Sequence, residues 1–172
     1  MVMIVIRSLR SSTQKLAKAY HSYRCKKRVA AFKGEPKVNF KSQFTSNTYL
    51  GVNTHFNGIT IAGRGKVEIG DNFHSGKDCQ IITDIHNFNG SKLPYDETYI
   101  VKQVKIGDNV WLGNNVIILG GVEIGEGCIV QAGSVVTKSL SPLSIAGGHP
   151  ATVFSQRDEK HYYSLKEQKA FH

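Results

Sequence analysis

The 172-residue sequence lacks several features that would assign it to a common functional class. Its three cysteines, Cys25, Cys79 and Cys128, form no CxxC pair, which argues against structural zinc and for a reducing, cytoplasmic setting. The seven histidines are not spaced as a metal site, so no metal is expected. The opening apolar run ends at Arg7, which makes it too short for a membrane span or a signal peptide.

Acidic residues are absent before Glu35, although nine cations stand in the first 34 residues. The net charge of the whole chain is also +9, so the basic character belongs to an N-terminal arm, residues 1–34. We expect a helix over 8–33, capping the open end of a repeat stack. Weak contact with anionic lipid or polymer is the second interpretation, and no nucleic-acid partner is expected. The cations are Arg7, Arg10, Lys15, Lys18, Arg24, Lys26, Lys27, Arg28 and Lys33.

A six-residue repeat dominates residues 106–141. The first place of each unit is aliphatic and the fifth is small or aliphatic, while Gly, Asn and Asp fill the places between. A six-residue unit of short strand plus turn forms one side of a triangular coil. Stacked hairpins would instead show turn signals every eight to twelve residues. The units begin at Ile106, Leu112, Ile118, Ile124, Val130 and Val136.

Weaker units extend the repeat back to Val38, with eight units before residue 87 and seven from Ile100 onward. Three units to a coil predict an all-β parallel β-helix of about five coils, over residues 35–153. The period breaks at 87–99, and a loop of this length inside a solenoid is more often functional than accidental. Cys79 and Cys128 occupy fifth places and are predicted to be inert core residues. Residues 154–172 are predicted to form a helical tail.

Four motifs resemble the hexapeptide-repeat acyltransferases, in the branch of galactoside, maltose, xenobiotic and capsule or O-antigen O-acetyltransferases. The resemblance implies a left-handed β-helix, a homotrimer with sites between subunits, and acetyl-CoA as co-substrate. It also implies direct acetyl transfer to a saccharide hydroxyl without a metal. The motifs are Val110–Gly113, Gly121–Gly125, Ala132–Lys138 and Ala146–Ala151.

The resemblance assigns the role of general base to the histidine at the base of the looped-out segment, which is His86 here. A positioned base that takes the proton of a poor hydroxyl nucleophile accelerates transfer by roughly 10²–10⁴. The alternative is a polar residue that only hydrogen-bonds the backbone. His74 and His55 are the second choices for the base, and either Asp84 or Asn53 is expected to orient the imidazole.

Two further sets of site residues follow from the resemblance. Acceptor contacts are expected from Asp84, Asn87, Tyr95 and Asp96. The acetyl-CoA slot is expected beside the later coils, where Trp111 either borders the active site or shields a subunit interface. Thr152 stands where the family often has a lysine, so Arg157 is expected to supply that charge. The slot residues are Trp111, Gly113, Ala132, Gly133, Ser134, Lys138 and Arg157.

Two rival classes of function stay open from the sequence. One is an N-acetyltransferase that acts on an amino sugar nucleotide, since the coils do not separate amine from hydroxyl acceptors. The other is a non-catalytic scaffold, or a metal-dependent enzyme of the carbonic-anhydrase kind on the same fold. Neither the acceptor nor the position acetylated can be identified from these residues.

Overall fold

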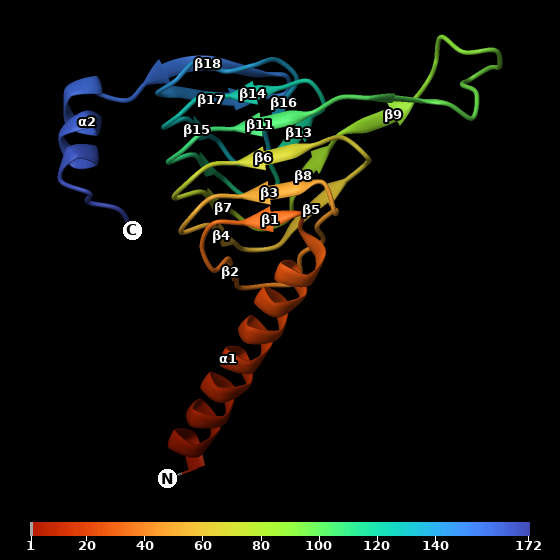
Figure 1. Cartoon of the computed structure of the whole chain (residues 1–172). Coiled ribbons are helices and arrows are strands. Elements are labelled where there is room, and N and C mark those ends of the chain that lie inside the picture. Colours follow the sequence, from red (N-terminus) through yellow and green to blue (C-terminus); the bar gives the residue numbers. More distant parts are fainter. Residues whose placement is uncertain (1) are drawn as a thin grey trace.

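The computed structural model describes residues 2–172, with side chains from Thr13 onward. It begins with a long helix, α1 (Val2–Arg28), of which only the C-terminal end lies against the coils (Figure 1). There Cys25 is buried, and Ser22 Oγ accepts a hydrogen bond from Val38 N at 3.0 Å. The helix ends earlier than the predicted residue 33, because Ala30 N already donates to Thr48 O and the chain joins a sheet.

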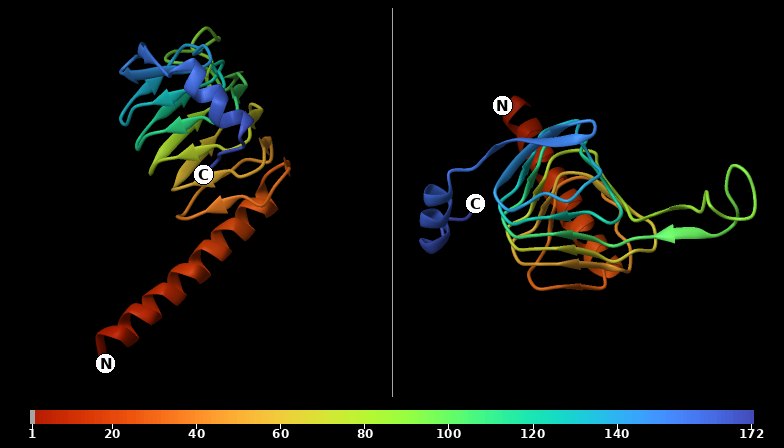
Figure 2. Two further views of the ribbon diagram at one scale, coloured as in Figure 1. Left: turned by 90° about the vertical axis from the view of Figure 1, so that its left-hand side faces the viewer. Right: turned by 90° about the horizontal axis from the view of Figure 1, so that it is seen from above.

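Three parallel sheets, here called faces A, B and C, form a triangular prism whose strands succeed one another coil by coil (Figures 1 and 2). Face A consists of β1 (Ala31–Phe32), β3 (Thr48–Leu50), β6 (Val67–Ile69), β11 (Val104–Ile106) and β14 (Glu123–Ile124). Face C consists of β5 (Ile59–Ala62), β8 (Cys79–Ile82), β13 (Ile117–Leu119) and β16 (Val135–Val136).

Face B carries six parallel strands and a seventh that runs antiparallel. The prism therefore has about six turns, not the predicted five, because partial turns extend it at both ends. The parallel strands are β2 (Lys37–Val38), β4 (His55–Phe56), β7 (His74–Ser75), β12 (Trp111–Leu112), β15 (Ile129–Val130) and β17 (Ser144–Gly148). The seventh is β18 (Ala151–Gln156).

The C-terminal segment is helical over a shorter range than predicted. Residues 154–156 belong to β18, which pairs with β17, and the helix α2 covers only Glu159–Glu167. Asp158 caps α2 by accepting a hydrogen bond from His161 N at its carboxylate, which satisfies one of the free amides of the first turn. Residues 154–156 are extended because β18 pairs with the free edge of β17, and the helix begins only after this hairpin.

The core fills the prism, since the first residue of nearly every repeat points inward and stacks on its counterparts; Ala62 is exposed and Ile100 is half-buried. On face A, Leu50 lies in register with Ile69, and Ile69 with Ile106. Each is at most 3% exposed, and such burial contributes about 1.5–3 kcal/mol per side chain. Cys79 and Cys128 are also buried, as predicted, and burial raises the pKa of both thiols.

Candidate functional site

The looped-out segment leaves the prism at the corner between faces C and A. After β8 the chain forms β9 (Asp84–His86), makes the loop 87–98 and returns as β10 (Tyr99–Val101). The two strands are antiparallel, with His86 opposite Tyr99. Both views of the fold show this hairpin projecting from one edge of the prism (Figures 1 and 2).

Two glycines of the preceding coil make room for this exit. A side chain at Gly63 would collide with Thr83 Oγ1 and with Asp84, and one at Gly65 would collide with Lys102 O. Gly63 also has a φ of +96°, which a residue with a Cβ rarely adopts. The glycines of the seven-residue repeat around 63–65 therefore leave the space that the chain needs where the looped-out segment departs and returns.

The imidazole of His86 is held between two tyrosine rings. Its centroid lies 3.9 Å from that of Tyr95 in a stacked arrangement, and 4.5 Å from that of Tyr99. The guanidinium carbon of Arg64 lies 3.7 Å from the centroid of Tyr99, which extends the stack by one layer. The two tyrosine rings therefore hold the plane of the His86 imidazole.

Asp84 reaches this stack through Arg64. Its Oδ2 lies 3.8 Å from Arg64 Nε, so the carboxylate fixes the cation that covers Tyr99. Asn53, the other residue expected to orient His86, is engaged on face B, where its Oδ1 lies 2.9 Å from His55 Nε2. Sequence reasoning missed Arg64, although its place in the irregular repeat was a usable signal.

Asn87 and Asp96, also predicted to contact the acceptor substrate, hold the loop together by hydrogen bonds. Asn87 Nδ2 donates to Thr98 Oγ1 at 3.0 Å, and Asp96 accepts from the amides of Ser91 at 3.0 Å and Thr98 at 2.9 Å. The pKa of Asp96 is lowered, first by the hydrogen bond from the Thr98 side chain and then by the hydrogen bonds from these amides. Gly90 allows the close approach, because a Cβ there would overlap the Asp96 carboxylate. The loop is therefore held by its own side chains.

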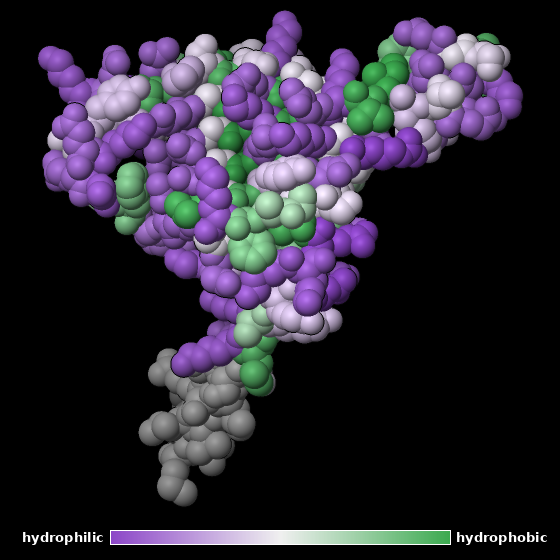
Figure 3. Space-filling model, in the orientation of Figure 1, coloured by the Kyte–Doolittle hydropathy of each residue, from purple (hydrophilic) through white to green (hydrophobic). Residues whose placement is uncertain are grey.

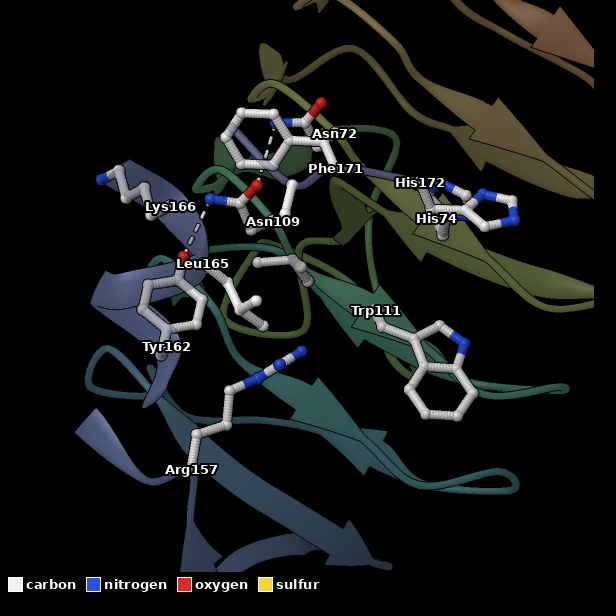
Figure 4. Close-up of a pocket in the computed structure, with 12 residues that line it drawn as sticks. Asn72, His74, Asn109, Trp111, Arg157, Tyr162, Leu165, Lys166, Phe171 and His172 are labelled. Carbon is white, nitrogen blue, oxygen red and sulfur yellow. Dashed lines mark hydrogen bonds between the residues drawn. The ribbon is translucent and has the colours of Figure 1, made fainter. Parts of the chain in front are cut away.

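A second candidate site is a cavity of about 560 Å³ between face B, α2 and the chain that follows α2. Figure 4 shows the Arg157 side chain extending toward Trp111 along the lining. Trp111 is 53% exposed, and Arg157 is fixed by donating from Nε to Gly127 O at 2.7 Å. The lining residues are Asn72, His74, Asn109, Val110, Trp111, Arg157, Tyr162, Leu165, Lys166, Ala170, Phe171 and His172.

Tyr162 fastens α2 over this cavity. Its hydroxyl donates to Glu126 Oε1 and accepts from Asn109 Nδ2, both at 2.8 Å. Burial, followed by the bond to Glu126, raises the pKa of this phenol. Lys166 also pairs with Glu126, so three interactions join α2 to the corner between faces A and B. Neither Asn109 nor Tyr162 was expected from the sequence, because their pairing spans 53 residues.

The remaining predicted slot residues lie at other corners. Gly113, Ala132 and Gly133 occupy turns between faces B and C, where a side chain at Gly113 would meet Ala132 N at 2.5 Å. Ser134 is buried, and its hydroxyl accepts from Gly148 N at 3.1 Å. Lys138 is exposed in the turn that leads from face C to face A. Of the predicted slot residues, Trp111 and Arg157 line the cavity beside face B.

The two histidines ranked behind His86 lie on face B. His55 and His74 stack at 4.2 Å, and His74 stands in register with Trp111. Burial, followed by the neighbouring His74 and Lys37, lowers the pKa of His55 to about 4. Burial also lowers the pKa of His74. His74 lines the cavity beside Trp111, whereas His86 is at the looped-out corner.

The looped-out corner and the cavity lie on opposite sides of the prism. Seen from above, α2 stands beyond one side and the β9–β10 hairpin extends from the other (Figure 2). Among residues 2–172, no group of three or more His, Cys, Asp or Glu is arranged to hold a metal ion.

The comparisons with known proteins agree with this architecture. The model of the bacterial transferase hexapeptide (six repeats) family matches residues 103–138. The galactoside O-acetyltransferase of Escherichia coli K12 is 35% identical over 132 residues, 75% of this chain and 64% of that protein. A solved galactoside acetyltransferase in complex with coenzyme A is 26% identical with a TM-score of 0.63, covering 78% of this chain and 63% of that one.

The chain belongs to the hexapeptide-repeat acyltransferase family. Its fold is accordingly the left-handed parallel β-helix. A maltose O-acetyltransferase from Clostridium difficile 630 is 32% identical with a TM-score of 0.62, covering 75% of this chain and 66% of that one. This hexapeptide-repeat chain therefore spans less than two thirds of the length of each of these three relatives.

Proposed function

We propose that this protein transfers an acetyl group from acetyl-CoA to a hydroxyl of a saccharide, with His86 as the general base. The observation that carries the proposal is the His86 stack at the base of the loop, on a chain of this family. Relatives named for galactoside and maltose acetylation, and one solved with coenzyme A, support the choice of substrates. The three cysteines are free, which agrees with a cytoplasmic reaction.

The reaction needs one acyl transfer and two proton transfers, the first to His86 and the second from it. The neutral imidazole of His86 accepts the proton of the saccharide hydroxyl as its oxygen attacks the thioester carbonyl. Collapse of the tetrahedral species breaks the C–S bond, and the proton passes to the departing thiolate. Tyr95 and Tyr99 hold the ring in one orientation, so little freedom has to be lost in the reactive complex.

We further propose that the active unit is a homotrimer. A cyclic arrangement can place the loop of one subunit beside face B of the next, where Trp111 and Arg157 line the cavity. Each site would then have two walls from different subunits. Arg157 and Lys138 would meet the phosphates of coenzyme A, and Trp111 would border the acyl group. Sedimentation of a fully active monomer would contradict this assembly.

The decisive experiment compares His86→Asn with His74→Asn in an assay of coenzyme A release, using a panel of saccharides and amino sugars. We expect His86→Asn to lower turnover roughly 100-fold, the lower end of what a positioned base supplies. Acetyl-CoA affinity and thermal stability should be retained, since His86 is exposed.

The control separates the candidates for the base. His74→Asn should have a mild effect, because His74 is proposed to line the pocket without taking the proton. An active His86→Asn together with an inactive His74→Asn would move the base to face B. Transfer to amino sugars alone would replace the hydroxyl acceptor by an amine. Two active variants would show that neither His86 nor His74 is the base.

A further inference from the structure

The proposed chemistry makes no use of most of α1. Figure 1 shows the helix extending well away from the coils, and only its last turns contact them. At 27 residues it is about 40 Å long, far more than a cap on one coil requires. Leu16, Tyr20 and Tyr23 are 71%, 57% and 55% exposed. Spacings of four and three residues place them on one face of the helix.

This apolar stripe is turned away from the prism. Cys25 is buried against the first coil, and Ser22 accepts the hydrogen bond from Val38 N. With 3.6 residues per turn, Ser22 and Cys25 lie on the side of the helix opposite the stripe. The coils therefore do not cover Leu16, Tyr20 and Tyr23, and this region juxtaposes hydrophobic and strongly hydrophilic surface (Figure 3).

Cations flank the stripe, and two of them lie over its tyrosine rings. The Arg24 guanidinium carbon is 5.9 Å from the Tyr20 centroid, and Lys27 Nζ is 5.8 Å from that of Tyr23. Lys15 and Lys18 are exposed on the same length of helix. Because no acidic residue precedes Glu35, a second copy of α1 would bring only charge of the same sign to this face.

We infer that α1 binds the surface of an anionic phospholipid membrane and lies in the plane of the interface. Exposed leucine and tyrosines would enter the headgroup region, while lysines and arginines would meet lipid phosphates. The described helices include none long and apolar enough to cross a membrane, so the contact is interfacial. The apolar stripe favours lipid over nucleic acid or an acidic polymer, which would require charge without buried hydrocarbon.

The test is co-sedimentation of the full chain, without substrates, with vesicles of phosphatidylcholine alone or mixed with phosphatidylglycerol. We expect binding at least about tenfold stronger on the anionic vesicles, and weaker at high salt. Leu16→Glu combined with Tyr23→Glu should weaken it at least about tenfold. Arg24→Gln and Lys27→Gln should each weaken it about fivefold and reduce its salt dependence.

A control is Phe154→Glu, which places one negative charge on an exposed aromatic of β18 and should leave vesicle binding unchanged. Circular dichroism and thermal unfolding would verify that each variant keeps its helix and coils. Equal binding to both vesicle types would overturn the inference, as would unchanged binding of the Leu16/Tyr23 variant. Displacement from vesicles by duplex DNA would assign α1 to a polyanion instead. Transfer to a soluble saccharide is measured separately, so failure here would leave the proposed activity standing.

Discussion

The interior of the coils and the looped-out corner are ordered by different interactions. Inside the prism each side chain has equivalents one turn above and below, and backbone hydrogen bonds repeat with every coil. At the corner, one stack of rings and the bonds of Asp96 fix a loop that has no repeat. Stability should therefore depend on the interior and turnover on the corner. Substitutions in the interior should lower stability and leave turnover unchanged, whereas substitutions at the corner should lower turnover and leave stability unchanged.

The largest expected effect is in the interior. Phe56 is fully buried and packs edge-on against Phe44 at 5.1 Å and against Phe73 at 5.5 Å. Phe56→Ala should lower the free energy of unfolding by about 3–5 kcal/mol, because the loss of buried surface leaves a cavity between rigid coils. Urea denaturation measures it. Phe154→Ala, at an exposed position, is the control, and an equal loss there would contradict the comparison.

A matched pair of threonines tests the polar part of the interior. The hydroxyl of Thr83 donates to Ala62 O at 2.9 Å and accepts from Gly65 N at 3.0 Å. Within the described residues, the buried Thr54 hydroxyl has no partner. Thr83→Val should therefore cost about 1–3 kcal/mol, whereas Thr54→Val should be neutral or stabilising. The same unfolding measurement decides, and a loss at Thr54→Val equal to or larger than the loss at Thr83→Val would refute the assignment of partners.

At the corner, Tyr95 tests whether stacking or its hydroxyl matters. Tyr95→Ala removes the ring that covers one face of His86. We expect turnover to fall about tenfold, because the imidazole is no longer held in one orientation, with little change in stability. Tyr95→Phe keeps the ring and should keep most of the turnover. Equal loss in both variants would instead support the sequence prediction that Tyr95 binds the acceptor.

The same contrast explains how much was predictable. Fixed period identified the coils and the buried places of Cys79 and Cys128, because a repeating environment selects repeating residues. Periodicity fixes the register less well in the early coils, where counting by sixes from Val38 places Thr60 at an inward-facing fifth place. It is exposed, while Ile59 and Ile61 point inward, because the strand is shifted by one place.

The parts that were missed depend on partners distant in sequence. The strand β18 forms at the free edge of β17, and nothing local to 154–156 indicates that edge. Arg64 joins the His86 stack across a full coil through Tyr99, and Tyr162 meets Asn109 from beyond the repeats. Periodicity describes contacts between equivalent places, and these pairs have no equivalents in other coils.

The smallest expected effect is a dependence of stability on pH that arises on the outer surface of face B. His55 Nε2 lies 2.9 Å from Asn53 Oδ1 and 3.1 Å from Lys37 Nζ, and its ring stacks on His74. The His172 ring lies 6.0 Å away. Burial of the ring comes first among the causes that lower the pKa of His55 to about 4, and the positive charges around it act in the same direction.

The sign follows from proton binding. The folded pKa of His55, about 4, is below the ordinary value of 6.5, so between these pH values the unfolded chain binds a proton that the folded chain does not. The free energy of unfolding should therefore be fully present above pH 6.5 and decrease as the pH falls toward 4. His55→Gln should flatten this part of the profile in urea titrations, whereas Phe56→Ala should lower the whole profile without changing its slope. An unchanged slope in His55→Gln would show that the pH dependence of the free energy of unfolding comes from groups other than His55.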